Sequence, residues 1–264
     1  MKRTIIALLA VTTLSSCTFI RIDTKALKAI LEKEGVDMTM EAGSPGKAIS
    51  GSGVEVREIR DIPEEFHAIS SHIPIDIEYS DGEQFVEITA SDNLMPYIST
   101  TVRDGVLKLQ FDGVRVRNAK DMKVVIRTPR LDSVSIGGAG DLELEGLVRT
   151  DDFRIEVNGA GDVDIDSLEA SSFTLRVNGA GDIDAETIRC TSFDVNVSGS
   201  GDIDVEHIDA ETIKVNISGA GDCSLAGRAR KGDFSVSGAG SVDIRNLKVD
   251  DVQSSMNGMA KIFR

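Results

Sequence analysis

The chain has 264 residues, with 29 Lys and Arg against 44 Asp and Glu, so its formal net charge at pH 7 is −15. An acidic surplus of this size disfavours binding to nucleic acid and to anionic lipid surfaces, because both repel negative proteins. Aromatic residues make up 4% and Trp is absent, so few aromatic side chains are available on which a ligand ring could stack. The three cysteines form no CxxC or Cys/His spacing, so no zinc motif is present.

Residues 1–16 have the pattern of a bacterial lipoprotein signal peptide. Lys2 and Arg3 make a basic start, and the apolar run over 5–14 is too short to span a bilayer. The run ends in LSSC, which resembles a lipoprotein cleavage box, so we expect Cys17 to be acylated and to become the first mature residue. The alternative is an ordinary signal peptide that contains a cysteine. Lipid at Cys17 would anchor the protein to a membrane without spanning it.

Residues 17–53 are expected to form the lipidated tether. Asp23 or Thr24 can cap a short helix over 26–34, which ends at a glycine. The following EAGSPGKAISGSG, residues 41–53, is rich in Gly and Ser and predicts a flexible linker.

Residues 54–130 are rich in predicted strands but follow no repeat. Apolar residues alternate over 73–77, and Asp-Gly pairs at 81–82 and 104–105 are hairpin or tight-turn signals. We expect this part to form the first, irregular coils and to cover one open end of a stack. An uncovered end would be a template for aggregation.

Residues 131–264 repeat the phrase V-x-V-[NS]-G-A-G-D-[IV]-D, in steps of 21, 20, 20, 20, 19 and 20 residues. A period of about 20 in β-type sequence is typical of stacked solenoid coils. Apolar and polar residues alternate on both sides of the GAGD turn, which predicts two short strands with one buried face. The predicted fold is all-β, a single-stranded right-handed parallel β-helix, or solenoid, with coils of about 20 residues.

Glycine suits the repeated turn because it accepts positive φ and lets adjacent turns nest without a Cβ between them. The turn glycines of the cleanest copies are Gly159, Gly161, Gly179, Gly181, Gly199, Gly201, Gly219 and Gly221. A third inward column is predicted at Leu147, Leu168, Ile188, Ile208 and Leu247. In the stretch AGRARKGD, residues 226–233, this column is lost to Arg228.

The second strand of each coil places acidic residues in three outward columns. These are Asp141, Asp162, Asp182, Asp202 and Asp222; Glu143, Asp164, Asp184 and Asp204; and Glu145, Asp166, Glu186 and Glu206. Like charges about 5 Å apart repel by roughly 1 kcal/mol in bulk water, so the fold must tolerate or neutralise them.

Three hypotheses account for these acids. In the first, the carboxylates of the first column accept hydrogen bonds from backbone N–H groups of the glycine turns, and the other columns are solvated. In the second, Ca²⁺ binds among Asp162, Asp164, Asp182, Asp184, Asp202, Asp204 and Asp222. The period differs from that of the nonapeptide calcium repeat, which makes the motif weak evidence. In the third, a glycan lyase or hydrolase uses a pair of the carboxylates.

No catalytic residue is predicted. An acid/base site should interrupt the acidic columns with an odd basic residue or Tyr, and no such break occurs between Asp162 and Glu206. The histidines His67, His72 and His207 are isolated in the sequence, and no nucleophile motif is present. Cys190 and Cys223 are expected to be buried free thiols, because they occupy different columns of the repeat.

Four ordered motifs together resemble the family named "putative autotransporter adhesin, head GIN domain". They are GSGVEVREIR at 51–60, FHAI at 66–69, TVRDGVLKL at 101–109 and the tandem GAGD coils. The resemblance covers residues 51–264. It implies a β-helix-like envelope lipoprotein of Bacteroidetes type, and it brings no catalytic or binding residues with it.

These observations predict a lipid-anchored cell-envelope protein of a Gram-negative bacterium, in the outer membrane and facing either periplasm or exterior. The expected role is a binding, adhesion or structural module, with a glycan or an envelope protein as partner. A second copy of the chain is a further candidate partner, in a homo-oligomer. A carbohydrate-active enzyme and a Ca²⁺-dependent glycan-binding or lipid-binding protein are the alternatives. No cofactor other than Ca²⁺ is expected, and no nucleic acid.

Overall fold

A computed structural model of the protein describes residues 48–119 and 121–264. The expected signal peptide, Cys17 and the short tether helix lie outside these residues. Within the described part the fold is all-β, with a β-solenoid of about 7 turns whose coils are about 20 residues apart, which confirms the predicted fold class. The described residues contain no helix with the length and apolar character that a membrane span requires.

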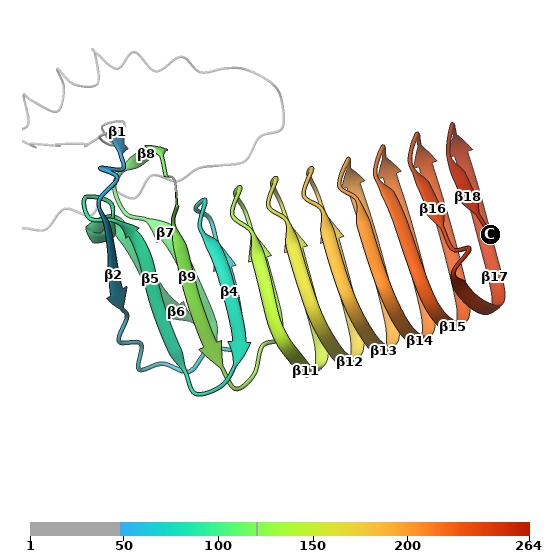
Figure 1. The fold of residues 1–264 in the computed structure, drawn as a ribbon, viewed down its shortest axis with the longest axis horizontal. Coiled ribbons are helices and arrows are strands. Elements are labelled where there is room, and N and C mark those ends of the chain that lie inside the picture. Colours follow the sequence, from blue (N-terminus) through green and yellow to red (C-terminus); the bar gives the residue numbers. More distant parts are fainter. Residues whose placement is uncertain (1–47, 120) are drawn as a thin grey trace, which may run out of the picture. The chain divides into compact units, whose positions relative to one another are not determined.

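The solenoid is a row of parallel strands that pair residue for residue with the coil before and the coil after (Figure 1). Phe173 lies opposite Phe193, and Asp164 lies opposite Asp184. The strands are β10 (Ser133–Ile136), β11 (Leu142–Val157), β12 (Val163–Val177), β13 (Ile183–Gly199), β14 (Ile203–Gly219), β15 (Asp222–Gly238), β16 (Ser241–Asp243), β17 (Leu247–Gly258) and β18 (Lys261–Phe263).

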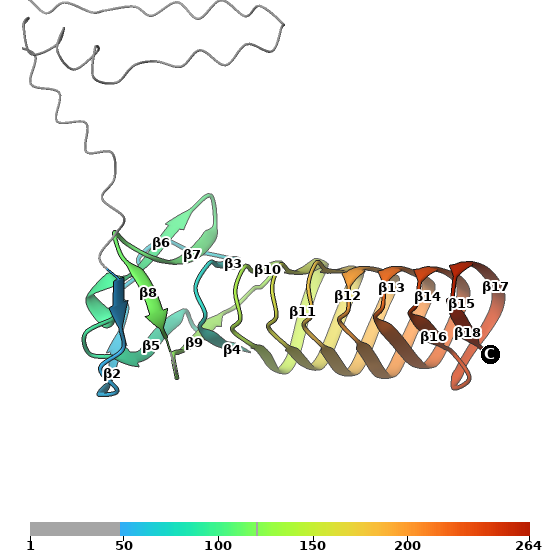
Figure 2. The same ribbon diagram turned by 90° about the horizontal axis from the view of Figure 1, so that it is seen from above.

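The coils follow one another along the stack and surround its interior (Figure 2). The core lies in this interior, because the coils of β11 to β14 turn the same columns of apolar residues inward. In the coil of β12 these are Val163 and Ile165, then Leu168, then Phe173, Leu175 and Val177, all buried. Like residues therefore stack on like residues. The rings of Phe153 and Phe173 lie 5.7 Å apart, and those of Phe173 and Phe193 lie 5.1 Å apart.

The third inward column begins one residue later than the sequence predicted. Val148, and not Leu147, pairs with Leu168 and is buried. The reason is an irregularity between Leu144 and Leu147, where Gly146 takes a φ of +73° and absorbs one extra residue. This insertion explains the single 21-residue step in the repeat.

The third apolar column is interrupted in the coil of β15, as predicted, but by Gly227 and not by Arg228. Gly227 occupies the inward position, between Ile208 and Leu247, and Arg228 pairs with Asp209 on the outside. The coil of β15 is one residue shorter between Val205 and Ile208 of its partner, which moves every following residue by one place. From Arg228 onward the register with β17 is uninterrupted.

The GAGD turns need glycine chiefly because they nest. A Cβ on Gly179 would lie 1.8 Å from the carbonyl oxygen of Gly159, and one on Gly161 would lie 2.0 Å from that of Gly140. Positive φ, the other expected reason, does not apply at Gly159, Gly161, Gly179 or Gly181. It applies at later turns such as Gly238, where φ is +130°.

The N-terminal strands continue the coil on two sides and then turn antiparallel. On one side the pairing order is β11-β4-β9-β5-β2, and on the other it is β10-β3-β7-β6. The strands are β2 (Glu55–Ile59), β3 (Ala68–Ser71), β4 (Asp76–Asp81), β5 (Phe85–Ser91), β6 (Ile98–Arg103), β7 (Val106–Phe111) and β9 (Lys123–Thr128), with one 3₁₀ helix, η1 (Met95–Tyr97).

The two Asp-Gly pairs have different outcomes. Asp104-Gly105 closes a hairpin between β6 and β7, with φ values of +52° and +74°. Asp81-Gly82 makes a tight turn but no hairpin, because β9 lies between β4 and β5. Within the expected linker, Ala48–Ser50 form β1, which pairs in parallel with β8 (Arg115–Asn118).

Candidate binding surfaces

The three acidic columns are where the sequence placed them, on the outward side of the strand segment that follows each GAGD turn. Asp164, Asp184 and Asp204 lie directly opposite one another in consecutive coils. Their outward positions alternate with buried residues such as Val163 and Ile165. We call this surface the acidic face.

The aspartates of the first column link the coils through hydrogen bonds. Oδ1 of Asp162 accepts the backbone N–H of Asp182 at 2.9 Å, and Oδ1 of Asp182 accepts that of Asp202 at 2.9 Å. In the same way the backbone N–H of Asp141 donates to Asp76, that of Asp162 to Asp141, that of Asp222 to Asp202 and that of Ser241 to Asp222.

The hypothesis of backbone capping is thus right that the carboxylates accept N–H groups of the GAGD turns. The donor is the last residue of the turn in the next coil, and not one of its glycines. The turn amide is already used, because the N–H of Ala180 donates to the carbonyl of Gly159 at 3.0 Å. The carboxylate thus supplies an acceptor for a backbone N–H that is not paired with a carbonyl of the neighbouring coil.

Replacing Asp182 with alanine should lower the free energy of unfolding by about 1 kcal/mol, because the backbone N–H of Asp202 loses its acceptor in the inter-coil hydrogen bond. Asp182→Asn keeps an acceptor oxygen and removes one like charge, so it should be close to neutral. Urea denaturation of both variants measures the difference. Equal losses for Ala and Asn would show that the charge, and not the hydrogen bond, is what matters.

The second column is electrostatically strained at its centre. The pKa of Asp184 is raised above its ordinary value of 3.8, first by partial burial and then by the neighbouring charges of Asp164 and Asp204. In the folded state this carboxyl group therefore holds a proton more tightly than in the unfolded chain.

Asp184→Asn should raise the melting temperature at pH 7 by about 2 °C, since it removes two close repulsions. A raised folded pKa means that the ionised group opposes folding above that pKa, and that the opposition disappears as the pH falls toward 3.8. The gain should therefore shrink at low pH and in high salt. Calorimetry at pH 7 and pH 4 tests this. A gain that is equal at both pH values would contradict it.

The candidate Ca²⁺ ligands do not gather into a binding group. Within residues 48–119 and 121–264, no three His, Cys, Asp or Glu side chains are placed to hold one metal ion. One oxygen of each first-column aspartate is already engaged by a backbone amide.

A further charged column, which sequence analysis missed, lies one residue after the third inward column. Charges of opposite sign alternate along its first five rungs, and we call it the alternating ladder. Its residues, one per coil, are Arg149, Glu169, Arg189, Asp209, Arg228 and Lys248. The alternation of charge can be found in the sequence. It was missed because the predicted third column began one residue too early, at Leu147, and because Arg228 was placed in that column.

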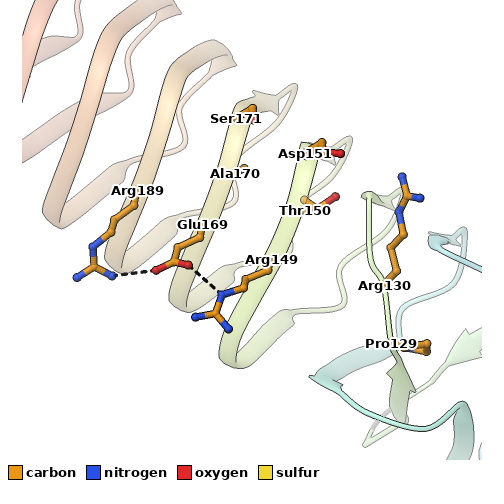
Figure 3. A pocket seen from close by; sticks show the side chains of 9 residues that line it. All are labelled: Pro129, Arg130, Arg149, Thr150, Asp151, Glu169, Ala170, Ser171 and Arg189. Atoms are coloured by element: carbon orange, nitrogen blue, oxygen red, sulfur yellow. Dashed lines mark hydrogen bonds and ion pairs between the residues drawn. The ribbon is translucent and has the colours of Figure 1, made fainter.

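An open groove of about 630 Å³ lies at the N-terminal end of the alternating ladder (Figure 3). Three arginines line it, namely Arg130 from the link between β9 and β10, Arg149 of β11 and Arg189 of β13. Glu169 of β12 stands between the last two. We call this the arginine groove.

Neighbouring carboxylates fix the arginines of the groove. Arg149 donates through Nε to Glu169 at 2.9 Å, and Nη1 of Arg189 lies 3.5 Å from the other oxygen of Glu169. Arg130 donates through Nε to Asp132 at 2.7 Å. The hydrogen bond from Arg149, chiefly, holds the pKa of Glu169 below its usual value, so this carboxylate is ionised at neutral pH.

Asp132 connects the groove to the N-terminal strands. Besides Arg130 it accepts a hydrogen bond from the Thr150 hydroxyl at 2.8 Å and lies 3.0 Å from Nδ1 of His67. Burial alone would raise the pKa of Asp132, but these partners outweigh it and lower the pKa. His67, which is isolated in the sequence, therefore has a carboxylate neighbour in the fold.

The thiols of Cys190 and Cys223 are free, as predicted. Cys223 is buried, whereas Cys190 is only partly buried, so the expectation of full burial is wrong for Cys190. Burial raises the pKa of both thiols to about 12, which keeps them protonated and unreactive at neutral pH.

Comparison with solved structures finds the same fold in proteins from Bacteroides and Parabacteroides. A putative adhesin from Bacteroides fragilis shares 28% identity, with a TM-score of 0.74 over 81% of this chain and 98% of that one. A putative lipid binding protein from Parabacteroides distasonis shares 19% identity, with a TM-score of 0.67 over 83% and 100% of the two chains. A putative adhesin from Parabacteroides merdae shares 20% identity, with a TM-score of 0.60 over the same shares.

A search of curated proteins found no match. The sequence profile of one protein family matches residues 65–187 and 175–263, which together cover most of the chain and both the irregular and the repeated strands. The family resemblance of the sequence motifs is thereby confirmed. The chain belongs to the family described as "Putative auto-transporter adhesin, head GIN domain".

Proposed function

We propose that the protein is a cell-envelope adhesion module, anchored by lipid at Cys17, which binds a glycan along the side of its solenoid. The arginine groove carries this proposal. It is a recess on a rigid sheet, where charged side chains are held by neighbouring residues and directed to solvent. Preorganised polar groups of this kind reduce the ordering cost of binding.

Membership of the adhesin family supports the proposal, as does the 28% identical protein from Bacteroides fragilis, which is described as an adhesin. The same relatives suggest a location in the cell envelope or at the cell surface. The LSSC sequence at residues 14–17 supplies the proposed anchor. A long side surface on which charged groups recur at the spacing of the coils suits a polymeric partner, since polymer repeats can meet coil repeats.

The charge state of the groove favours binding over hydrolysis. A general acid that works near neutral pH needs a raised pKa, whereas the pKa values of Glu169 and Asp132 are both lowered. These carboxylates orient arginines and hold no proton to give to a leaving group.

The anchor is tested by expressing the full chain and its Cys17→Ala variant in the same Gram-negative host. We expect the unaltered chain in the membrane fraction, with added mass from acyl chains, and the variant in the soluble fraction. External protease on intact cells then reports whether the solenoid faces outward. Identical fractionation of the two proteins would contradict lipid anchoring.

The binding role is tested on a glycan array with the detergent-solubilised full chain. We expect retention of intact glycan on the protein. New reducing or unsaturated sugar ends, detected by mass spectrometry of the bound fraction, would instead favour a hydrolase or lyase. A protein that retains no glycan would contradict the proposed ligand class.

A further inference from the structure

The arginine groove is close to neutral on a strongly acidic protein. Its lining contains Arg130, Arg149 and Arg189 against Asp151 and Glu169, a formal charge of +1, and Asp132, which holds Arg130 from outside the lining, brings the sum to zero, whereas the whole chain carries −15. Arg149 and Arg189 are largely exposed, with 71% and 57% of their side chains accessible. An anionic group is therefore repelled far less here than by the acidic face.

The arginines are oriented so that their outer nitrogens remain available. Arg130 and Arg149 are each held through Nε, which leaves both Nη groups free of these contacts. A guanidinium with two free Nη groups presents the planar fork that pairs with both oxygens of a carboxylate. Glu169 acts as a positioning residue, since its two oxygens hold Arg149 and Arg189 in one row.

The spacing of the row fits a polymer of sugars. Arg149 and Arg189 are two coils apart, which is about 9.6 Å at one strand spacing per coil. This is close to the length of one disaccharide in an extended β-linked glycan. Short side chains, Thr150, Ala170 and Ser171, complete the lining and leave room for sugar rings with hydroxyl partners.

We propose that the arginine groove binds an acidic glycan that carries a carboxylate on alternate sugars, with the glycan running along the coil stack. This inference rests on the proposed adhesion function and names its ligand class. Carboxylates two sugars apart meet Arg149 and Arg189, and Arg130 contacts the neighbouring part of the chain. The intervening neutral sugar lies over Glu169.

The test uses the full chain in mild detergent and two probes that differ only at the carboxylates. One is a hyaluronan hexasaccharide, which has a carboxylate on alternate sugars, and the other is its carboxyl-reduced form. We expect the reduced form to bind at least about tenfold more weakly in calorimetric titration, because it loses charge-assisted hydrogen bonds. Affinity for the acidic form should fall with salt.

The variant series uses a matched control from the same column. Arg149→Ala and Arg189→Ala should each weaken binding of the acidic hexasaccharide at least about tenfold. Arg228→Ala should change it less than twofold, although Arg228 is as exposed as Arg149 and also pairs with an acid, Asp209. Glu169→Ala should weaken binding at unchanged melting temperature, because Arg149 and Arg189 lose the acceptor that orients their forks, and a gain in affinity from the lost negative charge would contradict the positioning role.

Three outcomes would overturn the inference. They are equal binding of the two probes, equal loss for Arg228→Ala and Arg149→Ala, and no binding of the acidic probe. Retention of a neutral glycan on the array, unaffected by Arg149→Ala, would overturn the acidic ligand and leave the adhesion function standing. Melting curves of all variants separate lost binding from lost folding.

Discussion

Gly179→Ala should lower the free energy of unfolding by at least about 3 kcal/mol, although it adds one methyl group. That methyl carbon would lie 1.8 Å from the carbonyl oxygen of Gly159. The obstacle is backbone, which cannot rotate away as a side chain can. Separation of the coils would also stretch the bond between the N–H of Ala180 and the carbonyl of Gly159. Chemical denaturation measures the loss.

Gly146→Ala is the matched control. This glycine has a φ of +73°, but a Cβ built on it meets nothing within 4 Å. Its replacement should cost only about 1–2 kcal/mol, the penalty of a left-handed conformation in an L-residue. The pair thus separates the steric need for glycine from the conformational one. A smaller loss at position 179 than at position 146 would refute the nesting of the turns.

The second large effect should appear as a compensation between Gly232 and Phe234. One inward column lies in the strand segment that precedes each GAGD turn. Its residues in consecutive coils are Phe153, Phe173, Phe193, Ile213 and Gly232. The ring of Phe234, two residues later, fills the vacant space, since a Cβ on Gly232 would lie 2.5 Å from it. Phe234 is fully buried.

Phe234→Val alone should lose about 3 kcal/mol by leaving a void, and Gly232→Ile alone should lose about 1–3 kcal/mol by overpacking. The double variant repeats the Ile213 and Val215 of the preceding coil and should recover most of both losses. A coupling of at least about 2 kcal/mol is expected in a double-mutant cycle. Gly232→Ile combined with the distant Leu144→Ala should instead be additive. Additivity in both pairs would refute the compensation.

The repeat was sufficient to predict the solenoid because a 20-residue period fixes both the pairing partner and the inward face of each residue. Residues such as Asp164 and Asp184 could be stacked from sequence alone, and they are in register. The errors arose where the count changes by one. Gly146 adds a residue, and the coil of β15 omits one, so Val148 and Gly227 replaced the predicted inward residues.

The irregular strands were harder to predict because their partners are distant. Asp81-Gly82 signals a turn, but no local pattern indicates that β9 inserts between the strands it joins. The arginine groove combines both difficulties. Arg149 lies where the predicted column was displaced by one residue, and Arg130 comes from a segment before the repeat begins.

Because the charge of the alternating ladder changes sign from one coil to the next along its first five rungs, coils must be gained or lost in pairs to keep the alternation. Each coil offers its neighbours the same backbone and apolar columns, so gene duplication or loss of one coil would leave the core continuous. Loss of residues 183–202 would nevertheless place Glu169 beside Asp209, two like charges. Loss of residues 183–222 would place Glu169 beside Arg228 and preserve the alternation. The architecture can lengthen or shorten by one unit and keep its acidic face, but the alternating ladder keeps its pattern only when two units change together.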